Sequence, residues 1–237
     1  MILYHPYAEA LLNDRRLAAT WAFLEDTEPL LSPRWAFVHQ ACGPDTRYED
    51  GLKALWGQDD LVILEHDLAP TLDALVALEP AHHPLCAQAY SLYHDGKHGN
   101  ALDEAWAMAQ GITLDSPQAQ QVYDLCAQAY VLWHQSYRPD PREPRRYFAT
   151  CAHRTVDAQG QHHWVDDGQE WADLAGFGLL RITKAFQQAH APGWREGPWN
   201  NLDTRFSEWV YSMGIPFHVH WPEIPHHHHC PCHEQEG

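Results

Sequence analysis

Basic residues are scarce in this chain of 237 residues, and their scarcity limits what the protein can bind. Lysine and arginine together number 15 against 32 aspartates and glutamates, which gives a formal net charge of −17 with histidine neutral. This charge disfavours generic attraction to nucleic acid or to an anionic membrane, because both partners select for positive protein surfaces. A bound polyanion would require a local basic patch or a metal ion.

Long apolar runs and an export signal are also missing. No apolar stretch approaches the roughly 20 residues that span a bilayer. The first residues, MILYHPYAEALL, lack a basic start and are interrupted by Pro6, so they make a poor secretion signal. The six cysteines are spread along the chain, which favours reduced thiols. We expect a cytoplasmic protein without a membrane partner.

The chain is rich in the residues that build a core. Apolar residues make up 45% of it, with 11 tryptophans and 10 tyrosines, so a disordered chain is excluded. We expect a single catalytic domain over residues 1–222, followed by a His- and Cys-rich tail over 223–237. The tail end, HHHHCPCHEQEG, can extend a metal site, form a separate zinc site or stay disordered, and we favour a disordered or loosely metal-binding tail.

The order of apolar segments predicts an α/β fold. Strands are predicted at 2–4, 35–40 and 61–65, alternating with helices at 7–25 and 48–56. This alternation favours a mostly parallel central sheet flanked by helices. Thr71 is expected to cap a helix that Pro80 ends. Further elements are expected as loops at 136–147 and 160–168, a strand passing into a helix at 178–190, and a helix at 201–214 closed by Gly214.

One segment occurs twice. LCAQAYSLYH at 85–94 recurs as LCAQAYVLWH at 125–134, with eight of ten positions identical. Two copies are too few for a solenoid, so the pattern indicates a local duplication. We expect one copy in the sheet and the other packed nearby, and the sequence does not say which.

Acidic residues end the third predicted strand. Glu65, His66 and Asp67 follow directly on the apolar run LVIL. In an open parallel sheet, ligands bind beyond the carboxyl ends of the strands. Two carboxylates there repel each other unless a cation neutralises them, and Mg2+ or Mn2+ suits that role. The alternative is that Asp67 merely caps the next helix and His66 is a surface side chain.

A pair of histidines near the C-terminus offers further ligands. His218 and His220 alternate in the extended segment FHVHW, so both rings are expected on one face. Together with the carboxylates they would form a mixed oxygen and nitrogen site, which suits Mn2+ better than Ca2+. The alternative is that one of the two is a core histidine.

These motifs resemble those of glycosyltransferases with the nucleotide-sugar-binding A-type fold. DLVILEHD is similar to their strand and acidic metal motif, with Glu65 in place of the first aspartate, and HVH is similar to their C-terminal metal-binding histidine. NLDTRFSEWVYSMG resembles the segment that carries their acidic base, with Asp203 matching the base, Gly214 the glycine, and Leu202 standing where a glutamate is usual. The resemblance spans roughly residues 1–222 and extends to small glycosyltransferase-like proteins of phages and bacteria.

The resemblance implies a single-domain, Rossmann-like fold and a metal-dependent transfer of a hexose from a UDP- or GDP-sugar to an acceptor hydroxyl. It implies Mn2+ or Mg2+ as cofactor, and Asp203 as the base in an inverting reaction or as an acceptor-orienting group in a retaining one. The implied contacts are Asp67, Glu65, His220 and His218 for the metal, His5, Pro6, Tyr7, Gln40 and His66 for the nucleotide, and Trp199, Arg145 and Arg146 for the substrate.

Two other functions compete with this interpretation. Carboxylates and histidines also build metal-dependent hydrolases, although no H-E-x-x-H motif is present. The 19 histidines are compatible with a non-enzymatic metal-binding or storage domain. The acceptor stays open between a glycan, a protein, a small molecule and a hydroxylated base of phage DNA. Nucleic acid is disfavoured by the net charge unless the arginines of 136–147 grip it.

Overall fold

A computed structural model of the chain describes most of its N-terminal third and much of its C-terminal half. The described residues are 1–9, 15–43, 47–66, 68, 70–79, 82–93, 138–139, 146–148, 151–160, 162–165, 168–196, 202–221 and 226–227. Within these ranges no helix is both long and apolar enough to cross a membrane.

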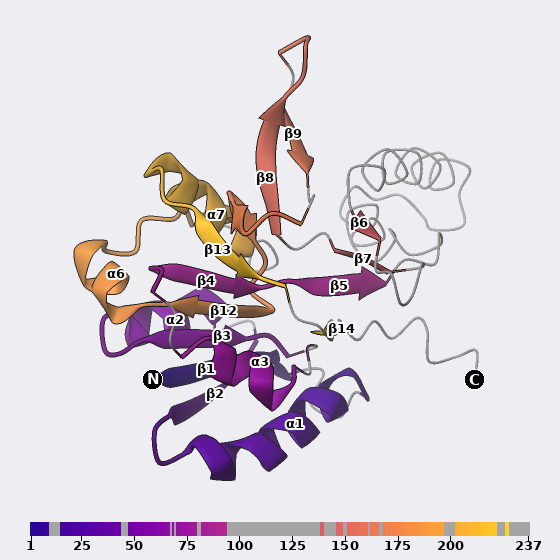
Figure 1. The fold of residues 1–237 in the computed structure, drawn as a ribbon. Helices are drawn as coiled ribbons and strands as arrows, with labels where there is room; N and C mark the ends of the chain where they lie inside the picture. The colour runs from indigo at the N-terminus through magenta and orange to yellow at the C-terminus, as the bar shows by residue number, and fades with distance from the viewer. Residues whose placement is uncertain are drawn as a thin grey trace, which may run out of the picture.

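A seven-stranded sheet forms the centre of the fold (Figure 1). Its strands in spatial order are β10 (Trp171–Ala172), β13 (Phe217–His220), β4 (Leu85–Gln88), β12 (Leu179–Ile182), β3 (Leu61–Leu64), β1 (Ile2–Ala8) and β2 (Ala36–Cys42).

The sheet is mixed, which corrects the prediction of a mostly parallel one. The pairs β1·β2, β1·β3 and β4·β13 are parallel, whereas β3·β12, β12·β4 and β13·β10 are antiparallel. The strand–helix alternation that predicted parallel pairing covers only the first three strands. β12 comes from much later in the chain and inserts antiparallel between β3 and β4, which local periodicity does not reveal.

The predicted alternation of the N-terminal third is confirmed, with shifted boundaries. Helix α1 (Arg15–Leu31) joins β1 to β2, and α2 (Tyr48–Leu55) joins β2 to β3. α1 begins later than predicted because β1 continues past Tyr4 and stays in register with β2 as far as the pair Ala8 and Cys42.

Helix α3 (Leu72–Ala77) begins as predicted at its cap. The Thr71 hydroxyl accepts a hydrogen bond from the backbone N–H of Ala74 at 3.2 Å, which satisfies one of the free donors of the first turn. The first copy of the repeated segment follows and forms β4 and then β5 (Tyr90–Tyr93). The β4 part of this copy therefore lies in the central sheet, while the second copy lies outside the described residues.

Two smaller sheets flank the central one. The first has β8 (Cys151–Val156) between β11 (Leu174–Ala175) and β9 (His162–Val165), and Figure 1 shows β8 and β9 projecting together from the body. The second has the order β14 (His226–His227), β5, β7 (Arg146–Phe148) and β6 (Arg138–Pro139). Both predicted loops therefore contain strands, because pairing with β8 or β5 supplies their backbone hydrogen bonds.

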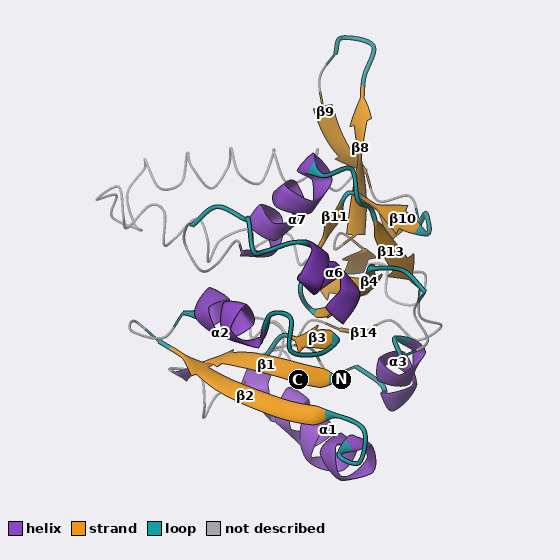
Figure 2. Ribbon diagram, turned by 90° about the vertical axis from the view of Figure 1, so that its left-hand side faces the viewer, coloured by secondary structure: helices purple, strands orange, loops and turns teal. Residues whose placement is uncertain are grey.

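Helices cover both faces of the central sheet (Figure 2). Leu61 and Ile63 of β3 pack in a core that includes residues of α2, α6 (Lys184–Ala189) and α7 (Leu202–Ser212). Val62 and Leu64 pack in a second core with residues of α1 and α3. All four side chains are fully buried, as a strand covered on both faces requires. We call these faces the α2/α7 face and the α1/α3 face.

The predicted strand and helix at 178–190 are confirmed as β12 and α6, and the helix at 201–214 as α7. Gly214 follows α7 with φ of +70°, the left-handed conformation that glycine adopts most readily at a helix end.

Candidate functional site

The carboxyl ends of β1, β2 and β3 lie at one edge of the sheet. The three strands are parallel, and β1 pairs with both neighbours. Tyr7 and Cys42, near the ends of β1 and β2, and Glu65, directly after β3, therefore all lie at this edge. Glu65 extends the ladder beyond β3, because its backbone N–H donates to the carbonyl of Gly178 at 3.1 Å. Such an edge is where α/β sheets bind ligands.

A buried tyrosine connects the two acidic candidates. Tyr48 begins α2 and belongs to the core of the α2/α7 face. Its pKa is raised well above the usual range, first by burial and then by electrostatic interaction with Glu65, Tyr4 and Asp203. Glu65 and Asp203 are therefore both near this phenol, although they are far apart in the sequence. The Tyr48 hydroxyl is buried and has no hydrogen-bond partner among the described residues.

Asp203 lies in the first turn of α7 and is partly buried. Burial raises the pKa of its carboxyl group. The backbone N–H of Thr204, which donates to it at 2.7 Å, acts in the opposite direction, as does the nearby positive charge of Arg205. A carboxylate with a raised pKa is a stronger base than an exposed one, so Asp203 has the property that proton abstraction requires.

A buried ion pair fixes α7 against α2. Arg205 Nη1 lies 3.1 Å from Glu49 Oε2, and the two side chains are only 9% and 3% exposed. Arg205 also donates to the carbonyl of Arg195, and Arg47 forms a second ion pair with Glu49. Glu49 is the residue after Tyr48 in α2, and Arg205 is two residues after Asp203 in α7. The ion pair between Glu49 and Arg205 therefore holds together the two helices that carry the phenol and the candidate base.

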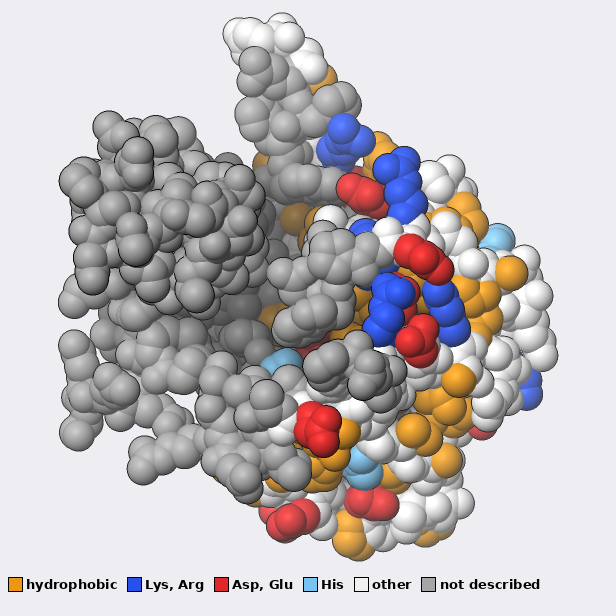
Figure 3. All heavy atoms as spheres, turned by 180° about the vertical axis from the view of Figure 1, so that it is seen from behind, with side chains coloured by type: hydrophobic (Ala, Val, Ile, Leu, Met, Phe, Trp, Pro, Cys, Tyr) orange, Lys and Arg blue, Asp and Glu red, His pale blue; other side chains and the backbone are white. Residues whose placement is uncertain are grey.

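Acidic and basic side chains alternate on the face shown in Figure 3. Lys53 of α2 adds a third cation, with its Nζ 3.8 Å from Glu49 Oε1. Three cations, Arg47, Lys53 and Arg205, therefore surround the single carboxylate of Glu49, which gives this part of an acidic protein a local excess of positive charge.

Gln40 of β2 has a structural role on the same face. Its Oε1 lies 3.1 Å from the Tyr4 hydroxyl, and its Nε2 donates to the carbonyl of Arg47 at 3.2 Å. The Tyr4 hydroxyl also lies 2.9 Å from the carbonyl of Tyr48. Gly51 leaves room for this contact, because a Cβ there would overlap both Gln40 Oε1 and the Tyr4 hydroxyl. Gln40 thus holds the start of α2 in place.

The predicted nucleotide contacts are divided between the two faces. His5 is fully buried on the α1/α3 face, where its Nδ1 lies 3.2 Å from His39 Nδ1 and its ring packs edge-on against Trp21. Burial, and then the charges of His39 and His66, lower its pKa to about 3. Tyr7 stacks on His5 and so lies on this face, and His66 is close enough to His5 to contribute to the lowering of its pKa.

Pro6 is buried and pairs with Gln40 in the ladder between β1 and β2. By alternation along β1 it points to the α2/α7 face, together with Gln40.

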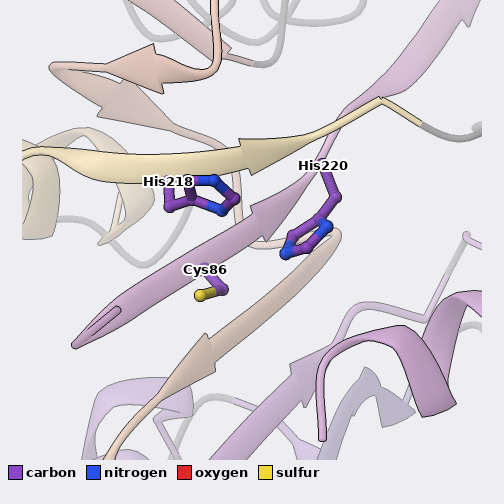
Figure 4. A group of neighbouring side chains, drawn as sticks. All are labelled: Cys86, His218 and His220. Carbon is purple, nitrogen blue, oxygen red and sulfur yellow. The ribbon is translucent and has the colours of Figure 1, made fainter. Parts of the chain in front are cut away.

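His218 and His220 lie on one face of an extended strand, as predicted. Their ring centroids are 4.8 Å apart in β13. Together with Cys86 of β4 they form a group whose possible ligand atoms all lie within 4.8 Å of one another (Figure 4).

The structure does not bring Glu65 to these histidines. Strands β12 and β4 stand between β3 and β13, so the two positions are roughly 14 Å apart at ordinary strand spacing. Cys86 packs in the core of the α1/α3 face, whereas Glu65 acts on Tyr48 of the α2/α7 face. The physical reason is the insertion of β12, which no local feature of the sequence predicts.

Several predicted residues fall outside this description. Asp67, Trp199 and Arg145 lie outside the described residues, and Arg146 is described only as part of the backbone of β7.

Sequence reasoning missed Tyr48, Glu49, Arg205 and Cys86. Arg205 lies in the NLDTRFSEWVYSMG segment and Cys86 in the repeated LCAQAY segment, but neither pattern gives these residues a role. Their partners come only from the tertiary pairing of α2 with α7 and of β4 with β13.

Comparisons with known proteins give only distant likenesses. No protein-family model matches the chain, and no curated protein matches it. Among solved structures, A197 from STIV aligns with a TM-score of 0.47 at 10% identity, over 93% of this chain and 81% of that one. A CMP:2-keto-3-deoxy-manno-octonic acid synthetase complexed with CTP aligns with a TM-score of 0.37 at 8% identity, over 94% and 89%. Both TM-scores are below 0.5, so neither likeness indicates a function.

Proposed function

We propose that the protein is a transferase that moves a sugar from a UDP- or GDP-linked donor to an acceptor hydroxyl. The reaction takes place at the carboxyl edge of β1, β2 and β3, on the α2/α7 face. The observation that carries this proposal is the placement of two carboxylates: Glu65 directly follows β3, where its backbone N–H extends the ladder to Gly178, and Asp203 lies in the first turn of α7, which packs on the α2/α7 face. The raised pKa of Tyr48, to which both carboxylates contribute, agrees with this placement.

Glu65 and Asp67 are the proposed ligands of a divalent cation. Glu65 follows β3 at the edge where ligands bind, and carboxylate oxygens are the donors that Mg2+ and Mn2+ prefer. When bound, the cation would neutralise charge that develops on the donor diphosphate. His218 and His220 have no part in this set, because they lie with Cys86 on the other face.

Asp203 is the proposed base for an inverting reaction. Its carboxylate takes the proton from the acceptor hydroxyl, whose oxygen forms a bond to the anomeric carbon. The bond between that carbon and the diphosphate oxygen breaks, and the nucleoside diphosphate leaves with the electron pair. The raised pKa of Asp203 supports this role. In a retaining reaction the same carboxylate would orient the acceptor.

The Tyr48 hydroxyl is proposed to bind substrate. It is buried, lacks a partner among the described residues and stays protonated because its pKa is raised. A neutral phenol donates a hydrogen bond, and both a diphosphate and a sugar hydroxyl can accept it.

Turnover of nucleotide sugars by the Asp203→Asn variant tests the proposal. A screen of UDP- and GDP-sugars with Mn2+ first identifies a donor by release of nucleoside diphosphate. Asp203→Asn should then bind that donor with unchanged affinity and turn it over about 10²–10⁴-fold more slowly, the range that a general base contributes. The matched control is Asp73→Asn, since Asp73 is an exposed carboxylate of α3. Full turnover in Asp203→Asn, or equal losses in both variants, would refute the role of Asp203.

A further inference from the structure

Four polar side chains lie together where β4 meets β13. The two strands are parallel, with His218 opposite Cys86 and His220 opposite Gln88. Alternate residues of a strand share a face, so all four side chains are on the same face of this pair. Figure 4 shows the rings of His218 and His220 extending from β13 on the side where Cys86 extends from β4.

The polar atoms of this group lack ordinary partners. His218 Nδ1, His220 Nε2 and Gln88 Oε1 are all buried and form no hydrogen bond within the described part of the chain. Gln88 is only 2% exposed, and its Nε2 donates to the carbonyl of Ala74 at 3.2 Å. A buried polar atom without a partner costs free energy, and the two unpartnered imidazole nitrogens point to a bound group that satisfies them.

Aromatic rings pack around the two histidines. Burial lowers the pKa of both imidazoles, as do the neighbouring histidines, whereas Glu170 acts in the opposite direction on His218. The ring of His83 stacks on His218 with centroids 4.2 Å apart, and Trp171 packs edge-on against the rings of His83 and His218. A neutral imidazole has a free lone pair, which is the form that binds a metal ion.

We propose that Cys86, His218 and His220 bind a zinc ion. A thiolate and two imidazoles form a nitrogen and sulfur set that suits zinc rather than Mg2+, Ca2+ or Mn2+. Their ligand atoms lie within 4.8 Å of one another. Tetrahedral bonds of about 2.0–2.3 Å would hold ligand atoms about 3.3–3.6 Å apart, so rotations that close the group by about 1 Å complete the site.

These three residues leave the fourth position of a tetrahedral zinc site to a further ligand. The ion would join β4, in the middle of the sheet, to β13, the last strand of the central sheet along the chain. It is independent of the cation proposed at Glu65, because the ligand chemistry differs and the two sites are on opposite faces.

Zinc binding must displace the proton of Cys86. Burial raises the pKa of this thiol to about 11, and its Sγ lies 3.7 Å from the carbonyl of His83. Metal coordination deprotonates a thiol outright, so one proton is released per ion bound.

Cobalt substitution tests the site in the full-length chain. Bound Co2+ gives a thiolate-to-metal charge-transfer band only when a cysteine is a ligand, and Zn2+ should abolish the band by displacement. The tail also contains cysteines, Cys230 and Cys232, beside four histidines. The double variant Cys230→Ser, Cys232→Ser should therefore keep a band with one Co2+ per chain, whereas Cys86→Ser in that background should lose it.

Two further variants keep the test decisive if Cys86→Ser folds poorly. His220→Gln in the same background should lose the high-affinity Co2+ band while circular dichroism stays unchanged. His190→Gln, at a partly exposed histidine beside Phe186, is the matched control and should keep the band. A band that survives both Cys86→Ser and His220→Gln, or that disappears with the tail cysteines alone, would overturn the proposal.

Discussion

Breaking the ion pair between Arg205 and Glu49 should destabilise the protein strongly. Arg205→Met leaves the Glu49 carboxylate, whose side chain is 3% exposed, without its buried partner. Removing one partner of a buried pair costs about 3–5 kcal/mol. Arg47 and Lys53 also approach Glu49 and compensate in part, so we expect the lower end, about 3 kcal/mol. For a chain of this length that corresponds to a fall of roughly 6–12 °C in Tm.

A double-mutant cycle measured by urea unfolding gives the test, with tryptophan fluorescence as the signal. Replacing both partners, Glu49→Leu with Arg205→Met, should recover most of the loss, because an apolar pair leaves no buried charge. Arg34→Met is the control, since it breaks the Arg34–Glu79 pair at a side chain that is 57% exposed and should cost at most about 1 kcal/mol. A loss below 1 kcal/mol for Arg205→Met, or a double variant as unstable as the two single losses added, would refute the reasoning.

Two further predictions concern side chains of β1. The pKa of His5 is about 3 in the folded protein against an ordinary 6.5, so only the unfolded state takes up this proton as the pH falls. The contribution of His5 to stability should therefore be constant above pH 6.5 and decrease by about 1.4 kcal/mol per pH unit below it, toward pH 3. Urea unfolding of wild type and His5→Gln at pH 7 and pH 5 should show a smaller decrease in the variant, and equal decreases would contradict the prediction. Gly51→Ala should lower the free energy of unfolding by about 1–3 kcal/mol, because the added Cβ would overlap the fully buried Tyr4 as well as Gln40. Unchanged stability in thermal unfolding would show that these side chains move aside freely.

Short sequence patterns predicted the helices and strands that surround the candidate site. The apolar run of β3, the cap at Thr71 and the glycine after α7 are features of a few neighbouring residues, and the structure has each of them where predicted. The alternation in FHVH likewise placed His218 and His220 on one face.

Long-range pairing could not be predicted from those patterns. The insertion of β12 between β3 and β4 separates Glu65 from His220, and it depends on contacts between segments that are far apart in the sequence. The partner of the two histidines is Cys86, which belongs to a repeated apolar segment with no mark of a metal site. The metal role of Asp67 stays a prediction.

Anomalous diffraction from crystals soaked with Mn2+ and a nucleotide sugar tests the central claim most directly. The transferase proposal predicts a manganese peak within coordination distance of the Glu65 carboxylate, with the diphosphate beside it and the nucleotide over the ends of β1 and β2. A nucleotide bound elsewhere, or manganese found only at Cys86, His218 and His220, would contradict it.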